Sequence, residues 1–130
     1  MKRVRKIFIG VIAANMAILV LFTGCAQKEY PKAKSINVII PKAPGGGTDT
    51  TARGLLQYMK NYAEGASFVP TNKPDGNGVT GMVETAKAKP DGYTLGMVTV
   101  ELAMFPHQNR SPVTYGDFIP IAAPIADPAA

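Results

Sequence analysis

The chain has one cysteine, one histidine and no tryptophan among its 130 residues. A single cysteine excludes an intramolecular disulfide framework and a cysteine-based zinc cluster. The lone histidine, His107, has no second metal ligand and no Ser or Cys nucleophile motif near it, so we expect it in a surface loop. We therefore expect no catalytic site built on these two residues, and neither a bound metal ion nor a cofactor.

Long apolar runs are also scarce. The run at Ile7–Phe22 contains Gly10 and Asn15 and is shorter than the roughly 20 apolar residues of a membrane-spanning helix. It follows a basic start and ends at the small residues before Cys25. This order is typical of a lipoprotein secretion signal, in which the thiol of Cys25 takes a diacylglycerol and the chain is cut before it.

The predicted organisation is therefore a signal peptide at residues 1–24 and a polar, lipidated tether at residues 25–35. The protein is expected in the cell envelope, held by lipid on the extracytoplasmic side of a membrane. Phe22 stands where Leu is usual in such signals. A free cysteine beside a signal cleaved elsewhere and a permanent transmembrane anchor remain as alternatives.

Basic charge nearly disappears from the predicted mature part. Four of the 14 Lys and Arg residues precede Cys25, so the formal net charge falls from +5 for the chain to +1 for the rest. The remaining basic residues are scattered among acids, without a basic stripe interleaved with aromatic residues. Nucleic acid is not an expected partner.

Apolar patterns predict alternating strands and helices from residue 36 onward. The β-branched run at Ile36–Ile40 is typical of a strand buried on both faces of a parallel sheet. Such alternation favours an α/β fold in which helices cover the sheet. The further strands are expected at Ser67–Val69, Tyr93–Val100 and Phe118–Ile125, and the helices at Ala52–Tyr62 and Val79–Ala86.

Turn-forming residues separate these elements. Gly65 is expected to stop the first helix and Pro90–Gly92 to end the second. A turn-rich loop is predicted at Pro70–Asn77, and a loop or irregular short helix at Glu101–Gly116.

A glycine-rich segment joins the first predicted strand to the first predicted helix. Glycines let a ligand approach the backbone, and N–H groups at a helix N-terminus bind carboxylate or phosphate. In open parallel sheets, ligands bind beyond the carboxyl ends of the strands. A binding site and a simple flexible turn both fit this pattern. The candidate residues are Ala43, Pro44, Gly45, Gly46, Gly47, Thr48 and Asp49.

Thr48 or Asp49 is also a plausible helix cap, and Asp49 either caps the helix or accepts from a polar ligand group. Neither phosphate fingerprint is complete, since Thr50 stands where a third glycine is needed and Gly47 stands where a Walker lysine would precede Thr48. Two other functions stay open: an exported α/β enzyme that uses the loop as an anion cradle, and a structural lipoprotein without a ligand. The enzyme lacks a G-x-S-x-G elbow.

Three segments resemble the Bug-type solute receptors of tripartite tricarboxylate transporters. They are Tyr30–Arg53, Asn72–Leu95 and Val113–Ala122, which follow the family's order and spacing. The resemblance implies a periplasmic-binding-protein-like α/β lobe with a parallel-rich sheet flanked by helices. Because the family's receptors are more than twice as long, residues 36–130 are expected to form an incomplete first lobe, with the second lobe absent.

The resemblance also implies a receptor, not an enzyme, that binds a small carboxylate and delivers it to membrane permease subunits. The carboxylate would be held by the loop from Ala43 to Asp49, and Thr99, Val100 and Glu101 would line the same cleft. Glu101 departs from the small or hydroxyl residues usual at this point. An acid there would repel a carboxylate unless it is paired, so the ligand carries a cationic group or Glu101 faces away.

Overall fold

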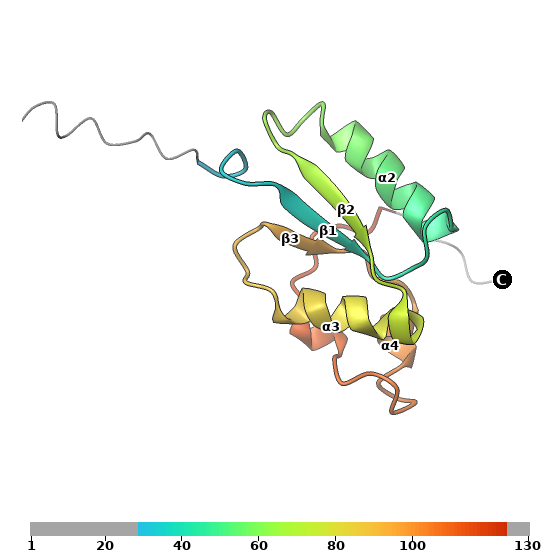
Figure 1. Ribbon diagram of the computed structural model, residues 1–130. Coiled ribbons are helices and arrows are strands. Elements are labelled where there is room, and N and C mark those ends of the chain that lie inside the picture. The colour runs from blue at the N-terminus through green and yellow to red at the C-terminus, as the bar shows by residue number, and fades with distance from the viewer. Residues whose placement is uncertain (1–28, 125–130) are drawn as a thin grey trace, which may run out of the picture.

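The structure is a computed structural model that describes residues 29–124. The predicted signal peptide, Cys25 and residues 125–130 lie outside this range. Within it, three parallel strands form a sheet in the order β2-β1-β3 (Figure 1). The predicted α/β alternation is confirmed. The elements are β1 (Ile36–Ile40), α2 (Gly47–Met59), β2 (Phe68–Asn72), η1 (Asp75–Gly78), α3 (Val79–Lys87), β3 (Thr94–Gly96), α4 (Glu101–Met104) and η2 (Tyr115–Asp117).

Helices cover both faces of the sheet, with α2 on one face and α3 on the other (Figure 1). Successive side chains of β1 point to opposite faces, so apolar residues are needed on both sides of the strand. Its one polar residue, Asn37, accepts a hydrogen bond from Thr71 Oγ1 of β2. Ile36 and Val38 pack with Leu56 of α2. Ile39 lies against Gly81 of α3, where an added Cβ would come within 3.2 Å of the Ile39 side chain.

A second apolar cluster lies under α3. Met82 of α3 packs with Leu102 of α4 and with Val113, and all three are buried. This cluster fixes α4 beside α3, and it thereby places the start of α4 beyond the end of β3.

The second strand is longer than the predicted Ser67–Val69 and includes Pro70. Ile36 N–H donates to the Ser67 carbonyl, and Lys73 N–H donates to the Ile40 carbonyl. Bonding groups alternate along a strand, so Pro70 has its missing N–H on the outer edge, away from β1. The predicted loop at Pro70–Asn77 therefore begins only after Asn72. Proline at this edge also hinders pairing with another strand.

The third strand is shorter than predicted, and the first helix begins and ends earlier than predicted. β3 ends at Gly96 rather than Val100, because the chain turns into α4 with Leu102 N–H bonded to the Thr99 carbonyl. α2 ends at Met59. The residues after it form turns, in which the N–H groups of Tyr62 and Ala63 donate to the Met59 carbonyl.

The last predicted strand, Phe118–Ile125, is wrong over its described part, since residues 118–124 contain no strand. Pro120 and Pro124 lack the N–H donors that a ladder needs. The prediction for Glu101–Gly116 is confirmed, because this stretch contains the short helix α4 and places His107 exposed in a turn. The second helix ends at Lys87, before Pro90.

Across residues 29–124, none of the helices has both the length and the apolar character that crossing a bilayer requires.

Candidate functional site

The candidate loop leaves β1 at the carboxyl edge of the sheet and enters α2. Residues 43–47 are exposed. Gly45 has φ +81°, and an added Cβ on Gly45 or Gly47 would meet no atom within 4 Å. Among the described residues, the N–H groups of Gly47, Thr48 and Asp49 have no acceptor, as is usual in the first turn of a helix. The loop therefore presents open backbone and free donors, which suit an anionic ligand group.

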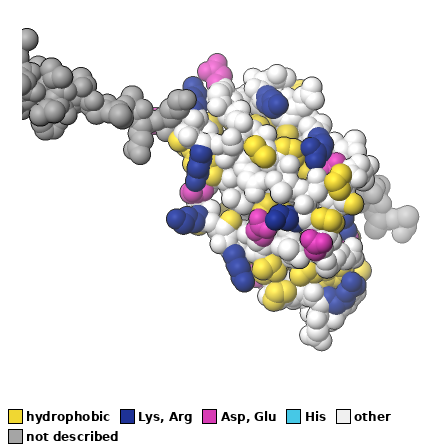
Figure 2. Space-filling view, in the orientation of Figure 1, with side chains coloured by type: hydrophobic (Ala, Val, Ile, Leu, Met, Phe, Trp, Pro, Cys, Tyr) yellow, Lys and Arg dark blue, Asp and Glu magenta, His cyan; other side chains and the backbone are white. Residues whose placement is uncertain are grey.

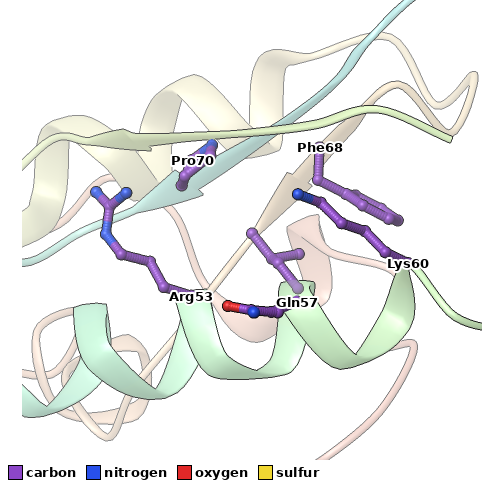
Figure 3. Close-up of a pocket in the computed structure, with 6 residues that line it drawn as sticks. Arg53, Gln57, Lys60, Phe68 and Pro70 are labelled. Atoms are coloured by element: carbon purple, nitrogen blue, oxygen red, sulfur yellow. The ribbon is translucent and has the colours of Figure 1, made fainter.

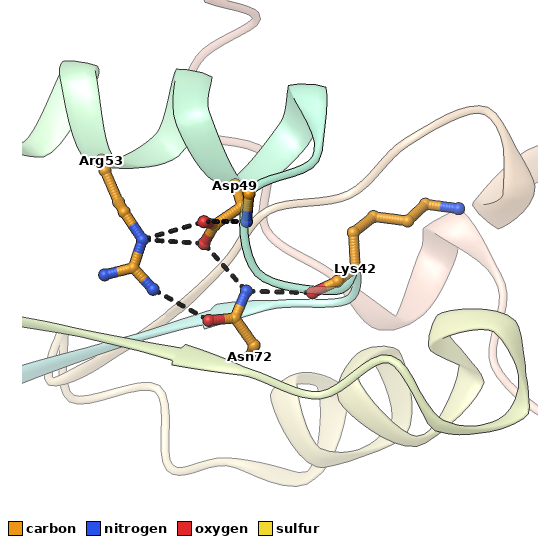
Figure 4. A network of polar contacts seen from close by, with 5 residues as sticks. Lys42, Asp49, Arg53 and Asn72 are labelled. Atoms are coloured by element: carbon orange, nitrogen blue, oxygen red, sulfur yellow. Dashed lines mark hydrogen bonds and ion pairs between the residues drawn. The ribbon is translucent and has the colours of Figure 1, made fainter.

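A buried carboxylate holds this loop in shape (Figure 4). Asp49 lies in the first turn of α2 and is only 3% exposed. It accepts from the Gly45 N–H at 2.8 Å, from Arg53 Nε at 2.9 Å and from Asn72 Nδ2 at 2.8 Å. These contacts join the loop, the helix and the end of β2.

Asn72 completes this group, which we call the Asp49 network. Asn72 Nδ2 also donates to the Lys42 carbonyl at 2.9 Å, and Arg53 Nη2 donates to Asn72 Oδ1 at 2.8 Å.

The N-cap of α2 is Gly46, and no side chain caps the helix there. The prediction that Thr48 or Asp49 is the N-cap is therefore wrong. Asp49 instead reaches back to the Gly45 N–H, one residue before the cap, and its carboxylate is turned inward.

The same contacts lower the pKa of Asp49. The hydrogen bond from Arg53 has the largest effect, those from Gly45 and Asn72 add to it, and together they outweigh burial. The pKa falls from 3.8 to about 2. The carboxylate is therefore ionised at neutral pH, and its oxygens are occupied by the protein's own donors.

Acid should weaken the fold through Asp49. With a pKa lower in the folded than in the unfolded protein, the carboxylate stabilises the fold above its ordinary pKa of 3.8, and this contribution is lost as the pH falls toward 2. We expect urea unfolding of Asp49→Asn to depend less on pH across this window than unfolding of the wild type. The pKa values of Asp91 and Glu101 are also lowered, so the comparison with Asp49→Asn isolates the share of Asp49. Equal pH dependence of the two proteins would contradict the assignment.

A second polar group joins the ends of β1 and β3. Lys42 follows β1 and donates from Nζ to Glu101 Oε1, while Thr99 Oγ1 donates to Glu101 Oε2. Lys42 and Glu101 form an ion pair whose side chains are largely buried. The structure therefore brings the two predicted loops together at one edge of the sheet.

The charge of Glu101 is neutralised within the protein. Burial acts to raise its pKa, but the hydrogen bonds from Lys42 and Thr99 outweigh burial and lower it. Both carboxylate oxygens are used, whereas the Lys42 ammonium has three N–H donors and Glu101 takes one. The expected repulsion of a ligand carboxylate is thus removed by pairing, without a cationic ligand group.

The predicted site residues differ in their position and burial. Ala43, Pro44 and residues 45–48 lie in the open loop and the first helical turn, Val100 is exposed beside Thr99, and Asp49 is buried behind the loop. Three contributors were missed: Lys42, Arg53 and Asn72. The i, i+4 spacing of Asp49 and Arg53 is a sequence signal for the ion pair. No such sequence signal marks Asn72, because its position at the end of a strand was predicted to lie in a loop.

A separate hollow of about 170 Å³ lies between α2 and β2 (Figure 3). It shares Arg53 with the Asp49 network but includes no residue of the candidate loop. Its lining residues are Arg53, Leu56, Gln57, Lys60, Phe68 and Pro70.

In the described range, no group of three or more His, Cys, Asp or Glu side chains is placed to hold a metal ion.

Comparison with known proteins identifies relatives of one kind, although no family model matches the chain. Protein BugT of Bordetella pertussis is 36% identical over 87 residues, which cover 67% of this chain and 26% of BugT. A UPF0065 protein of Agrobacterium vitis is 33% identical over 98 residues, covering 75% of this chain and 27% of the relative.

Solved structures agree with these relatives. The crystal structure of a TctC solute-binding protein from Polaromonas has a TM-score of 0.67 at 30% identity, covering 72% of this chain and 32% of that one. This similarity confirms the predicted periplasmic-binding-protein-like α/β fold over the matched part. The chain spans about a quarter of the length of the curated relatives. Its similarity to BugT and to the TctC solute-binding protein shows that, over that part, the chain belongs to the Bug-type receptor family of tripartite tricarboxylate transporters.

Proposed function

We propose that this protein is a non-enzymatic, extracytoplasmic receptor that binds a small carboxylate for a tripartite tricarboxylate-type transporter. The family supports a solute-binding role in transport, and a structural neighbour is described as a periplasmic transporter. In this proposal, membrane permease subunits receive the ligand, a diacylglycerol on Cys25 holds the receptor at the membrane, and residues 36–130 correspond to the N-terminal part of the first lobe.

The observation that carries the proposal is the open loop fixed by the Asp49 network. A ligand carboxylate would accept from the free N–H groups of Gly47 and Thr48, where the helix dipole favours negative charge. Lys42 would add a cation at the same edge, held in place by Glu101. Because Asp49 orders the loop before a ligand arrives, binding would not have to offset the entropy of ordering it.

Ligand-dependent stability tests this function. We expect the melting temperature of the chain to rise with the concentration of at least one of succinate, citrate, benzoate, glutamate and nicotinate, because a ligand that binds only the folded state stabilises it by mass action. Succinamide, benzamide and nicotinamide are matched controls that lack the charge, and they should have no effect. A chain that is folded but is stabilised by none of the acids, or equally by the amides, would contradict the proposal.

A further inference from the structure

Three connecting segments meet at the edge of the sheet opposite the candidate site. Residues 29–35 lead into β1, residues 60–67 join α2 to β2, and residues 88–93 join α3 to β3. They lie together at the left of Figure 1, where β1 begins. We call their exposed side chains, together with Tyr58 in the last turn of α2 and Lys87 at the end of α3, the amino-edge surface.

Contacts between these segments make one continuous surface. The rings of Tyr30 and Tyr93 pack edge to face at 5.1 Å between centroids, and Lys34 forms an ion pair with Asp91 at 3.0 Å. The side chain of Lys32 covers Gly65, where an added Cβ would come within 2.9 Å of it. The chain entering β1 is therefore fixed to both of the other connections.

Exposed tyrosines mark this surface. Tyr62 is 73% exposed, Tyr58 61% and Tyr30 58%. The rings of Tyr58 and Tyr62 are 5.2 Å apart, and their hydroxyl groups are 2.9 Å apart. A tyrosine has an apolar ring and a polar tip, and such side chains are enriched where a bilayer meets water.

The charge of the surface is positive, whereas the remaining described residues carry a slight excess of acids. Figure 2 shows Lys and Arg side chains along the side where the described chain begins. Lysines near an anionic leaflet are attracted to it within about a Debye length. The lysines are Lys32, Lys34, Lys60, Lys87 and Lys89, against the acids Glu29, Glu64 and Asp91. Among the other described residues, the basic ones are Lys42, Arg53, Lys73 and Arg110, and the acidic ones are Asp49, Asp75, Glu84, Glu101 and Asp117.

The proposed lipid attachment point adjoins this surface in the chain. Cys25 precedes Tyr30 by five residues, and five residues span at most about 18 Å. Tyr30 is itself packed on Tyr93. A lipid on Cys25 would therefore bring the amino-edge surface to the bilayer and leave the loop at residues 43–46 on the far side.

We propose that the amino-edge surface docks on an anionic lipid bilayer while the receptor collects its ligand, so that the carboxylate site is then turned away from the membrane. The receptor leaves this docked position to deliver the ligand to the permease. The proposal rests on the lipidation of Cys25 within the proposed function. It assigns the exposed tyrosines and lysines to headgroup contact, and it fixes the orientation of the protein relative to its anchor.

The test uses tryptophan, which the natural chain lacks. The full chain, produced in a bacterium that processes lipoproteins, is reconstituted into vesicles of phosphatidylglycerol and phosphatidylcholine with brominated acyl chains. Tyr62→Trp places the probe on the amino-edge surface, and Val100→Trp, at a position 67% exposed at the opposite edge, is its matched control. We expect at least twofold stronger quenching for Tyr62→Trp, and a weaker difference when phosphatidylglycerol is omitted.

Equal quenching at the two positions would overturn the proposal, as would stronger quenching of Val100→Trp. Tyr58→Trp replaces Tyr62→Trp if circular dichroism shows that the latter is unfolded. Intact mass separates the two premises: a diacylglycerol on Cys25 with equal quenching refutes the docking surface alone, whereas an unmodified Cys25 refutes the anchor and the docking together. Cys25→Ser should move the protein to the soluble fraction, and the carboxylate test above is independent of either result.

Discussion

Gly78→Ala is expected to destabilise the protein by about 3 kcal/mol or more, lowering the melting temperature by more than about 10 °C. Gly78 has φ +94°, and an added Cβ would lie 2.5 Å from the Pro41 carbonyl oxygen and 3.0 Å from its Cβ. The first contact is with backbone, so no side-chain rotation relieves it. Pro41 connects β1 to the candidate loop, and the clash would therefore displace the loop as well.

Gly76→Ala is the matched control for this prediction. Gly76 also has a positive φ, +61°, but an added Cβ would meet nothing closer than 3.6 Å. Only the cost of a left-handed alanine remains, about 1 kcal/mol. Thermal unfolding of both variants separates the two causes, and similar losses at the two positions would show that the close approach to Pro41 is unimportant.

Asp49→Ala is expected to lower both stability and ligand affinity. The substitution removes the acceptor of the Gly45 N–H and one of the two acceptors of Asn72 Nδ2, and it leaves Arg53 without its ion-pair partner. It also frees the loop from α2. We expect the melting temperature to fall by at least about 5 °C. We expect the affinity for a carboxylate to fall by more than about tenfold, because the loop must then be ordered by the ligand.

Asp75→Ala provides the comparison for Asp49→Ala. Asp75 is also acidic and lies at the start of a helical turn at the same edge, but it is exposed. Its replacement should change stability little. If Asp49→Ala lowered the melting temperature without weakening ligand binding, Asp49 would serve the helix alone, as a capping residue does.

The buried strand was the most predictable part of the fold. Four of the five residues of Ile36–Ile40 are apolar, because helices cover both faces of the sheet, and the bounds of the strand match the structure. The edge strands were less predictable. Pro70 argues against a strand in the sequence, and only the direction of its missing N–H, outward from β1, makes it compatible with one.

The position of the glycine-rich loop was predictable, but the contacts of the side chains around it were not. A strand passing through glycines into a helix located the loop at residues 43–47. The burial of Asp49 depends on Asn72, which is distant in sequence and is brought close by strand pairing. Likewise, the pairing of Glu101 with Lys42 requires β1 and β3 to be neighbours, and this cannot be derived from local spacing.

Carboxylate binding by the loop after β1 is tested most directly by titrating the ¹⁵N-labelled chain with the carboxylate that stabilises it most and following the backbone amides by NMR. If the loop after β1 binds the ligand, saturable shifts are expected at Gly47 and Thr48, with further shifts at Lys42, and none with the matched amide compound. Saturable shifts confined to the hollow beside Arg53 and Lys60, or no shifts in a folded chain, would contradict the claim that the loop after β1 binds the ligand.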